Sequence, residues 1–221
     1  MNCPLCLAGG TRFFCADRRR PYHRCVRCDL VFVPPAHHLD PAAEKRRYDL
    51  HRNAPGDAGY RAFLERLVRP LLARLPPGAQ GLDYGSGPQP VLSQMLAAAG
   101  HHMRQYDPYY APHPQVLEGR YDFLVCCETM EHFAAPAREW RRFLELVRPG
   151  GWLGVMTRLR DSAVPAPTDS EDAAARAFLD WYYKNDPTHV AFYSRATFRY
   201  LARRDGLAHD FLGDSVILLR R

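Results

Sequence analysis

One stretch, from Gly81 to Pro88, limits most strongly the folds that this chain can adopt. It reads Gly-Leu-Asp-Tyr-Gly-Ser-Gly-Pro and lies between a proline-rich break and an apolar helical run over residues 91–97. Glycines allow the backbone to turn tightly and let a ligand approach it closely. The helix that follows such a turn presents free N–H groups beside the ligand. The stretch therefore predicts a nucleotide-like cofactor at the carboxyl edge of a parallel sheet.

The length and composition of the chain fit one main globular domain with a small appendage. Of its 221 residues, 47% are hydrophobic and 24% are charged, so the chain can bury a core and is not a disordered protein. No run approaches the roughly 18 apolar residues that a membrane span requires. The N-terminus also lacks the charged-then-apolar pattern of an export signal. We therefore expect a cytoplasmic protein with no membrane partner.

Positive charge is concentrated near the N-terminus. The net charge is +6, and much of the excess lies in Arg18-Arg19-Arg20, Arg24, Arg27 and Lys45-Arg46-Arg47. A basic patch of this kind would suit RNA or another polyanion. A solvated surface explains the same charges, and we favour that interpretation.

Four of the seven cysteines form a metal-binding pattern. Cys3 and Cys6 make one C-x2-C pair, Cys25 and Cys28 make a second, and 18 residues separate the two pairs. Two-residue spacing places both thiolates of a pair on one turn, and two such turns complete a tetrahedral site. Four thiolates suit zinc, with iron as the alternative. We therefore predict a closed, structural zinc site in a zinc-ribbon-like module over residues 1–35.

Residues 36–80 are expected to form a helical connector that could also act as a lid. Asp40 and Pro41 indicate the start of a helix that runs to about His51. A second helix is expected from about Gly59 to Leu75, with Pro70 kinking or dividing it.

The next segments place polar residues at the ends of two further strands. A strand over 103–106 ends at Asp107, which lies 24 residues after Asp83 and is placed to accept hydrogen bonds from ribose hydroxyls. The apolar run 121–127 indicates a buried parallel strand. It opens into Glu128-Thr129-Met130-Glu131-His132, at the edge where an open sheet holds its site.

Together these segments resemble the class I S-adenosylmethionine-dependent methyltransferases. The resemblance covers about residues 60–221. It implies an α/β fold with a Rossmann-like, doubly wound, seven-stranded sheet whose last strand is antiparallel, in a cofactor-binding domain over 81–221. The segments that carry it are Asp83-Tyr84-Gly85-Ser86-Gly87, Tyr106-Asp107-Pro108, Asp122-Phe123-Leu124-Val125, Glu131-His132 and Val147-Arg148-Pro149-Gly150-Gly151-Trp152-Leu153.

The resemblance also implies roles for individual residues. Asp83 would orient the turn and meet the cofactor amine, and Asp107 would hold the ribose. Gln89 stands where the family often has a third glycine, and a nicotinamide dehydrogenase would need glycine where this chain has Pro90. The residues implied to contact S-adenosylmethionine are Asp83, Gly85, Gly87, Asp107, Glu128 and Thr129.

The acceptor side is expected in the aromatic segment 181–193, which lines the acceptor pocket in similar methyltransferases. His189 in this segment would serve as a general base near neutral pH, or as a buried structural histidine. A base is needed only if the acceptor must lose a proton. The candidate catalytic residues are Glu128, Glu131, His132 and His189. The alternative for Glu131 and His132 is a structural role that holds the end of the strand rigid.

Three functions remain open from the sequence. We favour methyl transfer from S-adenosylmethionine to a small-molecule acceptor, with the zinc module as a structural part. The first alternative is an RNA methyltransferase that uses the ribbon and the basic cluster for docking. The second is a non-catalytic binding module that has kept the fold.

Overall fold

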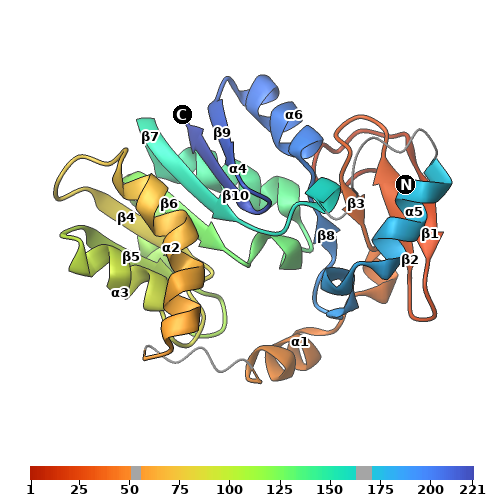
Figure 1. Ribbon diagram of the computed structural model, residues 1–221, viewed down its shortest axis with the longest axis horizontal. Helices are drawn as coiled ribbons and strands as arrows, with labels where there is room; N and C mark the ends of the chain where they lie inside the picture. Colours follow the sequence, from red (N-terminus) through yellow and green to blue (C-terminus); the bar gives the residue numbers. More distant parts are fainter. Residues whose placement is uncertain (51–55, 163–170) are drawn as a thin grey trace.

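The computed structural model describes residues 1–50, 56–162 and 171–221, which form two sheets and the helices that cover them (Figure 1). The strands are β1 (Thr11–Ala16), β2 (Pro21–Cys25), β3 (Val31–Phe32), β4 (Gln80–Tyr84), β5 (His102–Tyr106), β6 (Tyr121–Cys127), β7 (Val147–Met156), β8 (Ala191–Phe192), β9 (Ala208–Leu212) and β10 (Val216–Arg220). The α-helices are α1 (Pro41–Tyr48), α2 (Ala58–Leu72), α3 (Val91–Ala98), α4 (Pro136–Leu146), α5 (Glu171–Asp180) and α6 (Arg195–Asp205). Short 3-10 turns are η1 (Pro35–His37), η2 (Pro114–Glu118), η3 (Met130–His132), η4 (Arg160–Ser162) and η5 (Tyr182–Asn185).

The main sheet has the order β5-β4-β6-β7-β10-β9. The strands from β5 to β7 run parallel, and β10 lies antiparallel between β7 and β9, which confirms the expected antiparallel last strand. In the described residues the sheet has six strands, whereas seven were predicted. Residues 108–120, beyond β5, form turns and η2 instead of a strand. Three prolines in this segment explain the difference, because proline cannot donate to a ladder.

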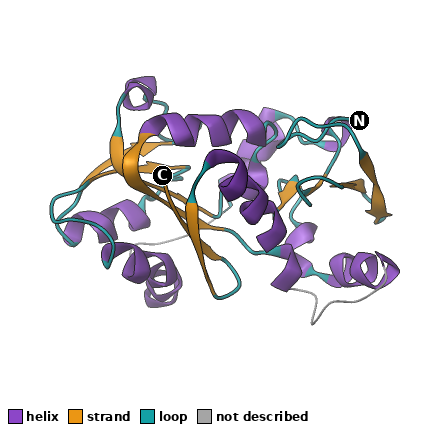
Figure 2. Ribbon diagram, turned by 90° about the horizontal axis from the view of Figure 1, so that it is seen from above, coloured by secondary structure: helices purple, strands orange, loops and turns teal. Residues whose placement is uncertain are grey.

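Helices cover both faces of the main sheet (Figure 2). On one face α2 and α3 pack their apolar residues against β6, β7 and β10. On the other face α4 and α6 pack over β6, β7 and β9. This is the layered arrangement of an open α/β sheet, and it leaves the carboxyl ends of the parallel strands available for a site.

The connector helices form near their predicted positions. The Asp40 side chain accepts a hydrogen bond from the Ala43 N–H and so caps α1. The predicted end of this helix at His51 lies outside the described residues. Helix α2 continues through Pro70 to Leu72, so the proline does not divide it.

The N-terminal module is built into the rest of the molecule. Its sheet has the order β1-β2-β3-β8, and β8 comes from residues 191–192, far along the chain. Tyr22 and Val31 of the module share an apolar cluster with Phe178 of α5 and with Phe192. In Figure 1 the module and α5 lie together on one side of the molecule, with the main sheet on the other.

The polar segment over residues 158–172 is only partly described. Residues 163–170 lie outside the described residues, and α5 begins at Glu171, where no helix was predicted. The described part is anchored, because the buried Arg160 guanidinium lies 2.5 Å from Asp29. No helix in the described part of the chain is long and apolar enough to cross a membrane.

Candidate active site

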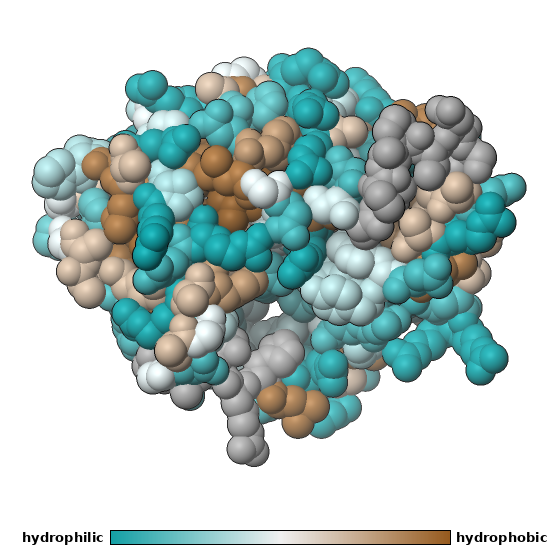
Figure 3. All heavy atoms as spheres, viewed as in Figure 1, coloured by the Kyte–Doolittle hydropathy of each residue, from teal (hydrophilic) through white to brown (hydrophobic). Residues whose placement is uncertain are grey.

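A cavity of about 680 Å³ lies at the carboxyl ends of β4, β5 and β6. Its wall also includes residues of α1, α2 and the segment before β8. In the space-filling view the molecule is hollowed in this region, above α1 and between the two sheets (Figure 3). The volume falls within the range of roughly 300–1,000 Å³ that is typical of small-molecule sites.

The glycine turn after β4 forms one wall of the cavity. Gly85 and Gly87 have φ angles of 84° and 64°, in the left-handed region that favours glycine. A Cβ on Gly85 would lie 2.2 Å from Thr129 Cγ2, whereas a Cβ on Gly87 would meet no atom within 4 Å. The Gly85 N–H donates to the Tyr106 carbonyl over 2.8 Å. The turn therefore needs glycine at Gly85 for space as well as for conformation.

Asp107 joins this turn to the segment after β5. Its Oδ2 accepts a hydrogen bond from the Gly87 N–H over 3.0 Å. Its Oδ1 accepts from the N–H groups of Tyr109 and Tyr110, over 2.8 and 3.1 Å. The carboxylate is buried and lines the cavity.

Asp83 has a different position. Its side chain is buried behind the turn, does not line the cavity, and accepts a hydrogen bond from Ser93 Oγ of α3 over 2.8 Å. Burial raises the pKa of Asp83 to about 7. This geometry links the turn to α3 and does not present the carboxylate to a ligand in the cavity.

Glu128 begins the polar segment after β6. Its φ of 46° is unusual for a residue other than glycine and marks local strain. The N–H donates to the Met156 carbonyl over 2.7 Å, which holds the strained turn against β7. Burial, with a smaller contribution from the charge of Glu131, raises the pKa of Glu128 to about 8. A carboxyl group that exchanges its proton near neutral pH suits acid–base chemistry.

The structure brings all four predicted catalytic candidates to the cavity wall. The Tyr183 hydroxyl donates to Glu131 Oε1 and lies 3.1 Å from Glu128 Oε2. The rings of His132 and His189 are 4.7 Å apart. Tyr183 was not singled out in the sequence, because nothing in an aromatic-rich segment marks which hydroxyl faces a carboxylate.

Helix α1 also contributes to the cavity in a way that the sequence did not specify. The Tyr109 hydroxyl donates to Glu44 over 2.8 Å, and the Tyr110 hydroxyl donates to Asp49 over 2.6 Å. These bonds join α1 to the turn that Asp107 organises. Residues of α1 and α2 therefore form part of the cavity wall.

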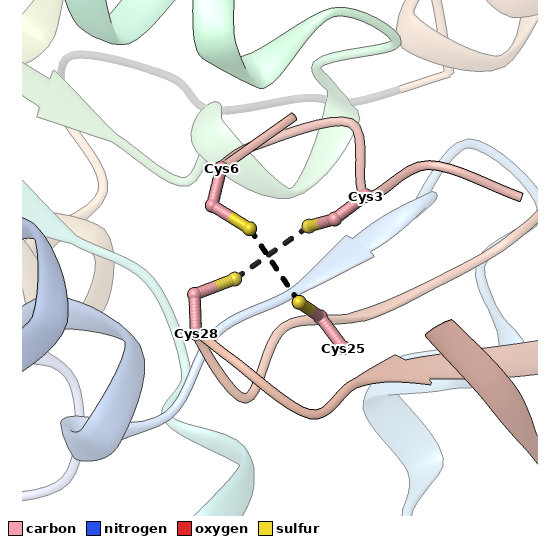
Figure 4. Close-up of side chains that lie close together, drawn as sticks. All are labelled: Cys3, Cys6, Cys25 and Cys28. Atoms are coloured by element: carbon pink, nitrogen blue, oxygen red, sulfur yellow. Dashed lines mark hydrogen bonds between the residues drawn. The ribbon is translucent and has the colours of Figure 1, made fainter. Parts of the chain in front are cut away.

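The four cysteines of the predicted metal site come together in the small module (Figure 4). Cys3 Sγ lies 3.5 Å from Cys28 Sγ, and Cys6 Sγ lies 3.5 Å from Cys25 Sγ. Zinc–sulfur bonds of about 2.3 Å in a tetrahedron place the sulfurs about 3.8 Å apart. The four thiols point toward a common centre in Figure 4, so the donor set fits a zinc ion.

The basic cluster is only partly exposed. Arg18 is at the surface, but Arg20 is buried and donates to the carbonyls of Lys184, Asp186 and Pro187 over 2.8–3.0 Å. Arg19 donates to the Asn185 carbonyl over 3.2 Å. Arg20 therefore holds the segment that leads to His189, and it is unavailable for the RNA docking that the sequence suggested.

Comparisons with known proteins agree with this fold and site. Residues 57–210 match the family described as "Methyltransferase domain". The chain therefore belongs to this methyltransferase family, and the predicted class of S-adenosylmethionine-dependent methyltransferase is confirmed.

One curated relative is the ubiquinone biosynthesis O-methyltransferase of Serratia proteamaculans. It is 36% identical over 76 residues, which are 34% of this chain and 32% of that protein, so the match spans about a third of its length.

Two solved structures share the fold. The 1,6-didemethyltoxoflavin-N1-methyltransferase of Burkholderia thailandensis, solved with S-adenosylhomocysteine, has a TM-score of 0.54 and 16% identity, covering 96% of this chain and 99% of that one. A chain from the Haloferax volcanii complex of the Trm112 methyltransferase activator with a methyltransferase has a TM-score of 0.50 and 13% identity, covering 82% of this chain and 98% of that one.

Proposed function

We propose that the protein transfers the methyl group of S-adenosylmethionine to a small-molecule acceptor. The single observation that carries the proposal is the cavity, which has the glycine turn on one wall and the polar cluster of Glu128, Glu131, His132 and His189 on another. Its volume of about 680 Å³ suits a cofactor with a small acceptor beside it. A folded polynucleotide would need an open basic groove instead.

The residues around the cavity suit this cofactor. The backbone at Gly85 and Gly87 would contact its methionine part, and Asp107 would hold its ribose beside the turn that it already organises. Thr129, which packs against Gly85, would line the cofactor site on the β6 side of the cavity. When bound, S-adenosylmethionine supplies an activated methyl group, so the protein contributes mainly proximity and orientation.

Proton transfer would involve the polar cluster if the acceptor carries a proton. Glu128 is the strongest candidate, because burial raises its pKa to about 8 and because it lines the cavity. His132 is a weaker base, because burial lowers its pKa to about 4. Asp83 would act indirectly, through the turn.

The three segments of the chain would have different roles. Residues 1–35 would bind a structural zinc through Cys3, Cys6, Cys25 and Cys28. They would also hold the aromatic segment 181–193 in place through the hydrogen bonds of Arg20. Residues 36–80 would cover the cavity. Residues 81–221 would bind the cofactor and the acceptor.

The acceptor class is tested with S-adenosylmethionine that carries a radioactive methyl group. The protein is incubated with cell extract separated into a small-molecule fraction and an RNA fraction. We expect label in the small-molecule fraction only, and a loss of labelling with the Asp107→Ala variant. Label in RNA would overturn the proposed acceptor class, and no label in either fraction would favour a non-catalytic binding module.

A further inference from the structure

A cluster of metal-ligating side chains lies in the cavity wall, apart from the four cysteines. Glu131, His132 and His189 each bring one ligand atom to within 4.8 Å of the other two. Glu131 and His132 belong to η3, after β6, whereas His189 lies just before β8. The fold thus brings these three residues together from two distant segments.

The hydrogen bonds of the two histidines determine which ring nitrogen carries the lone pair. His132 Nδ1 lies 3.2 Å from the Thr188 carbonyl oxygen, and His189 Nδ1 lies 2.7 Å from the Tyr183 carbonyl oxygen. A carbonyl only accepts, so Nδ1 donates in both rings, and the lone pair of each neutral ring is on Nε2. Metal-binding histidines commonly donate their other N–H to a carbonyl in this way, which orients the ring for the metal.

One oxygen of the cluster's carboxylate lacks a donor among the described residues. Glu131 is 1% exposed, and its Oε2 has no hydrogen-bond partner among the described residues. Its other oxygen accepts from the Tyr183 hydroxyl, which is also 3.1 Å from Glu128 Oε2. One hydroxyl hydrogen cannot serve two carboxylates. A buried carboxylate oxygen without a donor is costly, and a cation at this point would offset that cost.

We propose that Glu131, His132 and His189 form a divalent metal site that holds an oxygen-bearing methyl acceptor. The proposal rests on the proposed function and specifies the acceptor as a molecule with a hydroxyl, enol or carboxylate oxygen. Two imidazoles and one carboxylate are the donor set of catalytic zinc sites and of open non-haem iron sites. Three protein ligands leave coordination positions open to the cavity, where an acceptor oxygen would bind.

Small side-chain movements would complete the site. Metal bonds to imidazole nitrogen and carboxylate oxygen are about 2.0–2.2 Å long, so the three ligand atoms must draw closer together around an ion. Tyr183 would act as a positioning residue, because its hydroxyl holds Glu131 and its carbonyl holds His189. Loss of such a supporting hydrogen bond typically weakens metal affinity by about 10–100-fold.

The test adds Co²⁺ to the full-length protein loaded with one equivalent of zinc, enough for the four cysteines alone, and counts bound metals by native mass spectrometry, with visible absorption as a second signal. We expect one Co²⁺ beyond the zinc in the wild type. Glu131→Gln and His189→Gln should each abolish this uptake while the zinc stays bound. Tyr183→Phe should weaken it by about 10–100-fold. His102→Ala, which removes an exposed histidine at the start of β5, should leave it unchanged.

Retained zinc and an unchanged circular dichroism spectrum identify the variants that have folded. If the wild type binds no Co²⁺ beyond the zinc, or if the folded ligand variants bind as much as the wild type, the metal site is overturned. Calorimetric binding of S-adenosylhomocysteine to the same samples separates the two proposals. Cofactor binding without a second metal overturns only the metal site, whereas absence of cofactor binding overturns the proposed function.

Discussion

Replacing Asp83 with asparagine should change how the stability of the protein depends on pH. Asp83 is buried behind the glycine turn, where desolvation raises its pKa from 3.8 to about 7. In the unfolded chain the same carboxyl ionises near its ordinary value. Between these two pKa values, ionisation therefore favours the unfolded state.

The size of the effect follows from the two pKa values. A rise from 3.8 to about 7 corresponds to about 4 kcal/mol, at 1.36 kcal/mol per pKa unit. Below pH 4 the carboxyl is protonated in both states, and the folded wild type is at its most stable with respect to this group. The free energy of unfolding then falls as the pH rises, and the whole of the roughly 4 kcal/mol is lost above about pH 7. An asparagine side chain at this position would not ionise, and its amide oxygen would still accept the hydrogen bond from Ser93 Oγ.

Urea unfolding of the cofactor-free protein at a series of pH values measures this effect. The free energy of unfolding of Asp83→Asn, relative to wild type, should rise by about 4 kcal/mol between pH 4 and pH 8. Asp180→Asn, at the exposed end of α5, controls for the loss of one carboxylate. A difference for Asp83→Asn that stays constant or falls over this range would refute the reasoning.

Three further perturbations test other parts of the structure. Gly85→Ala should lower the free energy of unfolding by about 2–6 kcal/mol and Gly87→Ala by about 1–3 kcal/mol, because both strain a positive φ but only the substitution at Gly85 also clashes with Thr129. Equal losses for the two variants in urea unfolding would contradict this reasoning. Chelation of zinc, or Cys25→Ser, should lower the melting temperature of the whole protein in calorimetry, since the module shares its core with the main domain; an unchanged transition would argue against a structural metal. Arg20→Ala should lower the free energy of unfolding in urea by about 1.5–3 kcal/mol, whereas Arg18→Ala should change it by less than about 0.5 kcal/mol. Similar values for the two variants would show that the hydrogen bonds of Arg20 to the carbonyls of residues 184–187 do not stabilise the fold.

The parts of the fold that were predicted correctly depend on local patterns. The glycine turn, the apolar strand β6 and the Asp40 cap each follow from a few adjacent residues, and each is present in the structure. The spacing of the cysteine pairs likewise predicted their convergence.

The features that were missed depend on long-range pairing. Nothing near residues 191–192 indicates that they would extend the N-terminal sheet as β8. The burial of Arg20 against carbonyls about 165 residues away could not be predicted from the sequence either, because an arginine-rich run is typical of a solvated surface. The predicted seventh strand, which is not found among residues 1–50, 56–162 and 171–221, is a different case. Three prolines over 108–120 argue against a strand there, and the sequence shows them directly.

Calorimetric titration of S-adenosylmethionine into the zinc-loaded protein tests the central claim most directly. We predict binding at one site per chain, and a weakening of about 1–3 kcal/mol in Asp107→Ala, which loses a buried polar contact. Failure of the wild-type protein to bind S-adenosylmethionine would contradict the account.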